Sequence, residues 1–189
     1  MNLPNALTIL RIVLAFVFFF LVRQGGLLPN VLALIVFILA SVTDYLDGYF
    51  AKKYNLISAF GKLMDPIADK FLILAAFLVF AQMRLIAVWM FVAIFLRETI
   101  VTGLRLFEMK RGKIVAAEKA GKYKTVSQIV AISFILIFLI LRELWNTAYA
   151  IKTVIPLCHF VIDILMGIAV FLTLTSGGLY LWNNRSSLK

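Results

Sequence analysis

The sequence predicts an all-α integral membrane protein in which six transmembrane helices form a single domain over residues 1–189. Hydrophobic residues make up 63% of the chain, more than a soluble domain of this length carries. Apolar runs close to the length of a bilayer crossing recur from one end to the other. The net charge is +10, and the basic residues collect in the connections between these runs. Such clustering is typical of cytoplasmic loops that face anionic lipid, so it argues for membrane lipids and against nucleic acid as partners.

The first three predicted helices are separated by residues that disfavour a continuous helix. No small-residue cleavage site follows the first apolar run, because residues 23–26 read Arg-Gln-Gly-Gly, so we expect the first helix to remain uncleaved. The two glycines suit a turn, and Pro29 suits the first turn of the second helix. Pro66 is expected to start the third helix in the same way. The six expected helices cover about residues 6–22, 29–52, 65–84, 85–107, 117–141 and 153–182.

The last three helices are placed by the distribution of charge. Residues 105–124, between the fourth and fifth helices, hold seven of the 19 lysines and arginines. A short basic tail, residues 185–189, follows the sixth helix. The predicted outer connections hold only four basic residues: Arg23, Arg84, Arg142 and Lys152. This bias places both termini in the cytoplasm.

Four of the nine acidic residues lie close together in the sequence, between residues 44 and 69. Asp44 and Asp47 are three positions apart and Asp65 and Asp69 are four apart, so on helices each pair shares one face. Carboxylates brought this close repel one another unless cations lie between them, and hard divalent ions such as Mg²⁺ or Mn²⁺ prefer oxygen ligands. Both pairs are expected at the cytoplasmic interface of the membrane. The sequence therefore predicts a divalent metal site there.

The spacing of these aspartates, D-x-x-D-G-x-x-A-K and then G-x-x-x-D-x-x-x-D, resembles the signature of the CDP-alcohol phosphatidyltransferases. The opening P-N-x-L-T-x-x-R also resembles the start of this family. Lys52 stands where the family usually has Arg, which keeps the charge but loses the planar fork that binds phosphate in two places. Seven fixed positions match the signature: Asp44, Asp47, Gly48, Ala51, Gly61, Asp65 and Asp69.

The resemblance implies cleavage of a CDP-linked lipid with release of CMP, assisted by two Mg²⁺ or Mn²⁺ ions that neutralise the pyrophosphate. One carboxylate spared from tight ligation can accept the proton of the incoming alcohol, and Asp69, one helical turn after Asp65, is the predicted base. The implied metal ligands are Asp44, Asp47, Asp65 and Asp69. The implied nucleotide-binding residues are Asp44, Asp47, Gly48, Ala51, Lys52 and Asp65. Further candidate substrate contacts are Asn5, Thr8 and Arg11.

The acceptor pocket is expected among the basic residues beside the acids. Many cations suit an acceptor with its own phosphate, although attraction of a basic loop to anionic lipid explains most of the lysines equally well. Residues 97–105 and 119–128 are similar to segments of bacterial phosphatidylglycerophosphate synthases, a group within the family. This similarity implies transfer from CDP-diacylglycerol to glycerol 3-phosphate, in the bacterial inner membrane and in a homodimer. The expected acceptor-phosphate contacts are Arg105, Arg111, Lys119 and Lys122.

Three alternatives remain open from the sequence: a sibling enzyme that uses inositol phosphate, serine or a lipid alcohol, a cation transporter, and a non-catalytic scaffold. A transporter would more naturally place its acids near the midplane of the membrane. Outside the motif, Asp163 falls in an apolar run and needs a partner, for which Arg97 or another buried polar group is the hypothesis. Glu98 competes for Arg97, and a position of Arg97 facing the motif aspartates remains an open alternative. Cys158 and His159 are expected to be structural.

Overall fold

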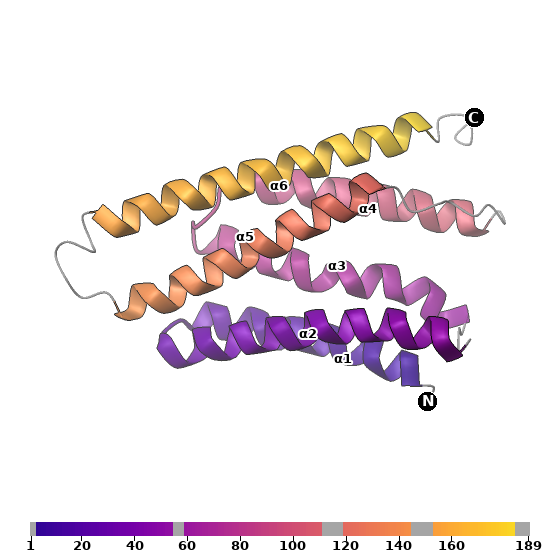
Figure 1. Ribbon diagram of the computed structural model, residues 1–189, viewed down its shortest axis with the longest axis horizontal. Helices are drawn as coiled ribbons and strands as arrows, with labels where there is room; N and C mark the ends of the chain where they lie inside the picture. Colours follow the sequence, from indigo (N-terminus) through magenta and orange to yellow (C-terminus); the bar gives the residue numbers. More distant parts are fainter. Residues whose placement is uncertain (1–2, 55–58, 111–118, 145–152, 184–189) are drawn as a thin grey trace.

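The computed structural model describes residues 3–54, 59–110, 119–144 and 153–183, and these residues form helices without any strand. The chain runs up and down through an elongated bundle (Figure 1). The all-α prediction is therefore confirmed for the described part of the chain. The helices are α1 (Leu3–Gln24), α2 (Leu27–Tyr54), α3 (Ala59–Gln82), α4 (Val88–Lys110), α5 (Lys119–Leu144) and α6 (Ile155–Asn183).

The helices pack in an order that brings distant segments together. Helix α1 packs against both α2 and α3, α4 packs against α3 and α6, and α5 packs against α6 and α2. Figure 1 shows both chain termini at the same end of the bundle. The end of α2, the start of α3, the end of α4 and the start of α5 also lie at this end. The helix segments that carry the acidic motif therefore lie at the same end of the molecule as the end of α4 and the start of α5.

The interior and the outer surface of the bundle are both apolar. The core contains fully buried aromatic side chains from three helices, including Phe18, Phe77 and Phe138. Large apolar side chains are also exposed on all six helices, for example Phe20 and Phe171. Within the described residues, 121–144 and 155–183 are long and apolar enough to cross a membrane, and 27–43 and 70–82 are shorter apolar segments. An apolar exterior of this kind fits a membrane protein.

The connection between α1 and α2 agrees with the sequence prediction, whereas the start of α3 does not. Gly25 and Gly26 adopt φ values of 69° and 91°, which glycine tolerates best. Helix α3 begins at Ala59 rather than near Asp65, so Pro66 lies inside the helix and not in its first turn. A proline inside a helix lacks the N–H that would bond to the carbonyl four residues earlier, and its ring crowds that carbonyl, so its position in a first turn is a preference and not a requirement.

Helix α3 ends in a Schellman motif. The amide of Leu85 donates to the carbonyl of Phe80 at 2.9 Å, and the amide of Arg84 donates to that of Ala81 at 3.1 Å. Arg84 adopts a φ of 58°, and Phe80 and Leu85 are both buried, as this motif requires. The motif turns the chain sharply into α4.

Candidate functional site

The residues of the acidic motif lie on two helices at the same end of the bundle. Residues 44–52 are in the last part of α2, and Asp65 and Asp69 are in the first part of α3. Their helical register places each pair of aspartates on one face, as the sequence predicted. Arg111 lies outside the described residues. For the other candidate residues, the structure describes the backbone but not the surroundings of the side chains. These are the motif residues Asp44, Asp47, Gly48, Ala51, Lys52, Asp65 and Asp69, together with Asn5, Thr8 and Lys119.

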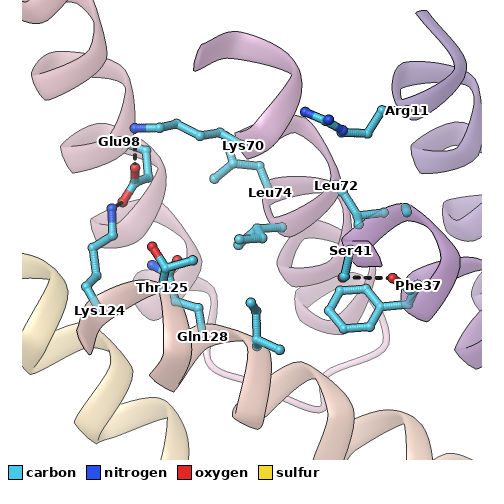
Figure 2. Close-up of a pocket in the computed structure, with 13 residues that line it drawn as sticks. Arg11, Phe37, Ser41, Lys70, Leu72, Leu74, Glu98, Lys124, Thr125 and Gln128 are labelled. Carbon is cyan, nitrogen blue, oxygen red and sulfur yellow. Dashed lines mark hydrogen bonds and ion pairs between the residues drawn. The ribbon is translucent and has the colours of Figure 1, made fainter. Parts of the chain in front are cut away.

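A cavity of about 200 Å³ lies next to these segments and is lined by α1 to α5 (Figure 2). Ser41, three positions before Asp44, and Lys70, directly after Asp69, both line it. Arg11 is buried and lies across this central cavity from Glu98. The central cavity therefore extends inward from the level of the acidic motif.

Cations from three helices contact the carboxylate of Glu98 in α4. Its Oε2 accepts a hydrogen bond from the Nζ of Lys70 at 2.7 Å, and its Oε1 accepts one from the Nζ of Lys124 at 2.5 Å. The Nη1 of Arg97 also contacts Oε1, at 3.2 Å. Figure 2 shows Lys70 and Lys124 converging on this carboxylate from α3 and α5. Since Glu98 is only 3% exposed, it needs such partners, and it ties the three helices together.

A second pocket, of about 420 Å³, adjoins the central cavity and shares Lys70, Lys124 and Thr125 with it. We call it the basic pocket, because five cations and no carboxylate line it among the described residues. Positive charge held in a concave site attracts anions, and lysine and arginine form strong charge-assisted hydrogen bonds with phosphate and carboxylate oxygens. The cations are Lys70, Arg97, Arg105, Lys122 and Lys124.

Two residues of α6 help to shape the basic pocket. The Oγ of Ser176 accepts a hydrogen bond from the Nη2 of Arg97 at 2.9 Å. The ring of Tyr180 lies under the guanidinium of Arg105, 5.9 Å from its central carbon. The hydroxyl of Tyr180 donates to Glu108 Oε2 at 2.7 Å, which fixes the ring against α4. A buried bond from Gln128 to Thr173, at 3.0 Å, holds α6 against α5 nearby.

The structure brings together some of the residues predicted from the sequence and adds others. Arg105 and Lys122, two of the four expected acceptor contacts, line the same basic pocket. Lys70, Lys124 and Glu98 were not identified as site residues from the sequence. Lys124 belongs to the basic segment between residues 105 and 124, and Lys70 directly follows a motif aspartate. Both lysines could therefore have been proposed as site residues from the sequence.

The predicted pairing of Asp163 with Arg97 is wrong. Asp163 is exposed on α6, and the Arg97 guanidinium contacts Glu98 and Ser176 instead. Residues 163 and 176 are 13 positions apart, which is about 20 Å along a helix. Residue counts along α4 and α6 therefore indicated the wrong turn of α6 as the neighbour of Arg97. His159, by contrast, packs edge-on against Phe138 with ring centroids 5.2 Å apart, as a structural residue does.

The described side chains contain no cluster of three or more metal-binding residues. The acidic motif supplies four carboxylates, two in the last part of α2 and two in the first part of α3, and helical spacing puts each pair on one face of its own helix. Oxygen donors of this kind suit Mg²⁺ and Mn²⁺.

Comparison with known proteins identifies the family. A family model described as CDP-alcohol phosphatidyltransferase matches residues 1–176. The chain is 38% identical over 200 aligned residues to CDP-diacylglycerol–glycerol-3-phosphate 3-phosphatidyltransferase of Bacillus subtilis, covering 100% of this chain and 97% of that protein. Proteins of the same name from Rickettsia bellii and Cereibacter sphaeroides are both 35% identical, over 95% and 71% of this chain and 93% and 62% of their own lengths. The chain belongs to the CDP-alcohol phosphatidyltransferase family.

Proposed function

We propose that this protein transfers the phosphatidyl group from CDP-diacylglycerol to sn-glycerol 3-phosphate, giving phosphatidylglycerophosphate and CMP. The basic pocket beside the acidic motif is the observation that carries this proposal. A family member needs one site for the CDP-linked lipid and one for the acceptor alcohol, and a pocket lined by five cations suits an acceptor that bears a phosphate. The names of the similar bacterial proteins specify the same acceptor.

The acidic motif serves the CDP-lipid in this proposal. Residues 44–52 and Asp65 contact the cytidine nucleotide and, with Asp69, hold two Mg²⁺ or Mn²⁺ ions. When bound, these ions neutralise the pyrophosphate and make CMP a better leaving group. Lys52 supplies a positive charge next to the nucleotide phosphate. Arg11, which lines the central cavity, is proposed to contact the substrate, and Asn5 and Thr8, earlier in α1, are proposed as further substrate contacts.

The transfer itself is a displacement at phosphorus. The acceptor hydroxyl oxygen forms a bond to the phosphorus that carries diacylglycerol, and the bond from that phosphorus to the bridging oxygen breaks. CMP leaves with the bonding electrons, and the hydroxyl proton passes to the Asp69 carboxylate. Arg105, Lys122, Arg111 and Lys119 are proposed to hold the acceptor phosphate, so that its hydroxyl is directed toward the acidic motif.

The same proposal includes a setting in the bacterial inner membrane, with both termini and the active site on the cytoplasmic side. The apolar outer faces of the helices support embedding in lipid, and the shared end of the termini and the acidic motif supports one-sided access. A water-soluble acceptor then reaches the basic pocket from the cytoplasm while CDP-diacylglycerol stays in the bilayer. A homodimer is proposed from family resemblance.

The decisive experiment measures CMP release by the purified protein in mixed micelles of detergent and CDP-diacylglycerol. Glycerol 3-phosphate, inositol phosphate and serine are supplied separately, with Mg²⁺ or Mn²⁺, and the lipid product is identified by mass. We expect rapid CMP release and phosphatidylglycerophosphate with glycerol 3-phosphate alone. Faster turnover with another acceptor would refute the proposed acceptor, and CMP release that is independent of any acceptor would refute transfer.

A further inference from the structure

The basic pocket depends on a close contact between α4 and α6 that involves Gly177. A Cβ atom built on this glycine would lie 2.8 Å from Cγ and 3.0 Å from Nε of Arg97. Cγ is the second carbon of the arginine side chain, so moving only the guanidinium would not relieve a clash between Cγ and a methyl group on residue 177. Arg97 therefore crosses α6 through a space that only glycine leaves open.

The neighbouring residue then fixes where the guanidinium ends. Ser176 Oγ accepts from Nη2 at 2.9 Å, and Glu98 Oε1 accepts from Nη1 at 3.2 Å. Ser176 and Glu98 are both 3% exposed, so water competes little for these bonds. Arg97 and Ser176 both line the basic pocket. The guanidinium is thus held at the pocket wall from α4 and α6 together.

We infer that Ser176 and Gly177 are positioning residues that hold Arg97 as a binding group for the acceptor phosphate. The inference rests on the proposed function and extends it to α6, and Gly177 lies just beyond the residues matched by the family model. A guanidinium held at both ends loses little freedom when an anion arrives, and guanidinium groups bind phosphate oxygens through paired N–H donors. Arg97 then acts on the acceptor, while Ser176 and Gly177 act only through Arg97.

The chain offers a matched control for this inference. Gly178 is the next residue of α6, is exposed, and has no atom within 4 Å of a Cβ built on it. Gly177→Ala and Gly178→Ala therefore make the same chemical change, with the same gain in helix propensity, one position apart. Only Gly177→Ala displaces Arg97.

The test measures binding of inorganic phosphate and of glycerol 3-phosphate to the full-length protein in detergent, by calorimetry, and separately the KM for each substrate. Gly177→Ala should weaken phosphate binding and raise the KM for glycerol 3-phosphate by about tenfold, the effect of one charge-assisted hydrogen bond. The KM for CDP-diacylglycerol should change less than about twofold, and Gly178→Ala should match the wild type in every measurement. Ser176→Ala, which adds no volume, should cause a smaller loss in the same direction.

A double-mutant cycle separates positioning from general damage to the fold. Arg97→Ala removes the atoms that a new methyl group would strike, so adding Gly177→Ala to it should weaken phosphate binding no further. Additive losses, unchanged phosphate affinity in Gly177→Ala, or an equal loss in Gly178→Ala would each overturn the inference. A wild-type protein that binds inorganic phosphate through Arg97 but uses another phosphorylated acceptor would refute the proposed acceptor and leave the inference standing.

Discussion

Replacing Glu98 with glutamine should destabilise the protein far more than its modest change in shape suggests. The carboxylate is 3% exposed and is shared by Lys70, Lys124 and Arg97, at 2.7, 2.5 and 3.2 Å. Two unit charges about 4 Å apart in a partly buried site interact by about 4 kcal/mol. Glu98→Gln removes the only carboxylate that these contacts share and leaves three cations facing one another.

The expected loss in the free energy of unfolding is about 3 kcal/mol, the lower part of the range for breaking a buried ion pair on one side. The lower part applies because the two adjoining pockets give the lysines some access to water. The matched control is Glu143→Gln, whose partner Arg142 lies 3.8 Å away and whose side chain is 34% exposed. An exposed pair of this kind contributes at most about 1 kcal/mol.

The assay is reversible unfolding of the full chain in mixed detergent micelles, followed by tryptophan fluorescence. Inorganic phosphate should partly restore the stability of Glu98→Gln, because an anion in the basic pocket replaces the missing negative charge and stabilises the folded state by mass action. A loss no larger than that of Glu143→Gln would refute the view that Glu98 holds the cluster together. A full loss that phosphate does not reduce would instead refute the binding of an anion beside these cations.

Four further predictions concern single positions. Asp69→Asn should abolish transfer while CDP-lipid binding is largely kept, because an amide cannot accept the alcohol proton; near wild-type turnover would exclude Asp69 as the base. Lys52→Arg should leave kcat equal or higher, and a loss of more than about tenfold, equivalent to about 1.4 kcal/mol of barrier, would show that the site requires lysine. Arg105→Gln should raise the KM for glycerol 3-phosphate much more than that for CDP-diacylglycerol; equal increases would place Arg105 on the nucleotide or in the fold. Arg84→Gly should stabilise the protein by about 0.5–1 kcal/mol in the same unfolding assay, because glycine adopts the φ of 58° without strain, and a loss of stability would contradict this reading.

The course of the backbone could be read from the sequence because it depends on signals that are local along the chain. Long apolar runs, the Gly25-Gly26 turn and the charged connections place five of the six helix starts within a few residues of those observed. The start of α3 was missed, since the rule that places proline in a first turn is only a local preference. Residues 59–65 are helical before Pro66, so α3 continues through the proline in spite of its missing hydrogen bond.

The candidate site was predictable only where its residues are close in sequence. The aspartates of the acidic motif are recognisable because helical spacing alone brings each pair to one face. Lys70, Glu98 and Lys124 meet from α3, α4 and α5, and no local pattern states which faces of those helices point inward. The error at Asp163 has the same cause. Its partner was inferred from residue counts along two helices, and such counts do not show which faces of the helices meet.

The arrangement of these contacts suggests why the acceptor side of the site is held by so many buried ion pairs. Lys70 lies directly after Asp69 in α3 and is bonded to both Glu98 and Thr102 of α4, at 2.7 and 2.6 Å. The two lysines of the cluster line both the central cavity and the basic pocket, so a shift of either ammonium group changes both sites. Because Glu98 contacts both lysines, the helix that bears Asp65 and Asp69 is tied to the helices that bear the cations of the basic pocket. If the two substrates bind as proposed, such a link would keep the distance between them constant, which an in-line transfer between a lipid-bound phosphate and a water-soluble alcohol requires.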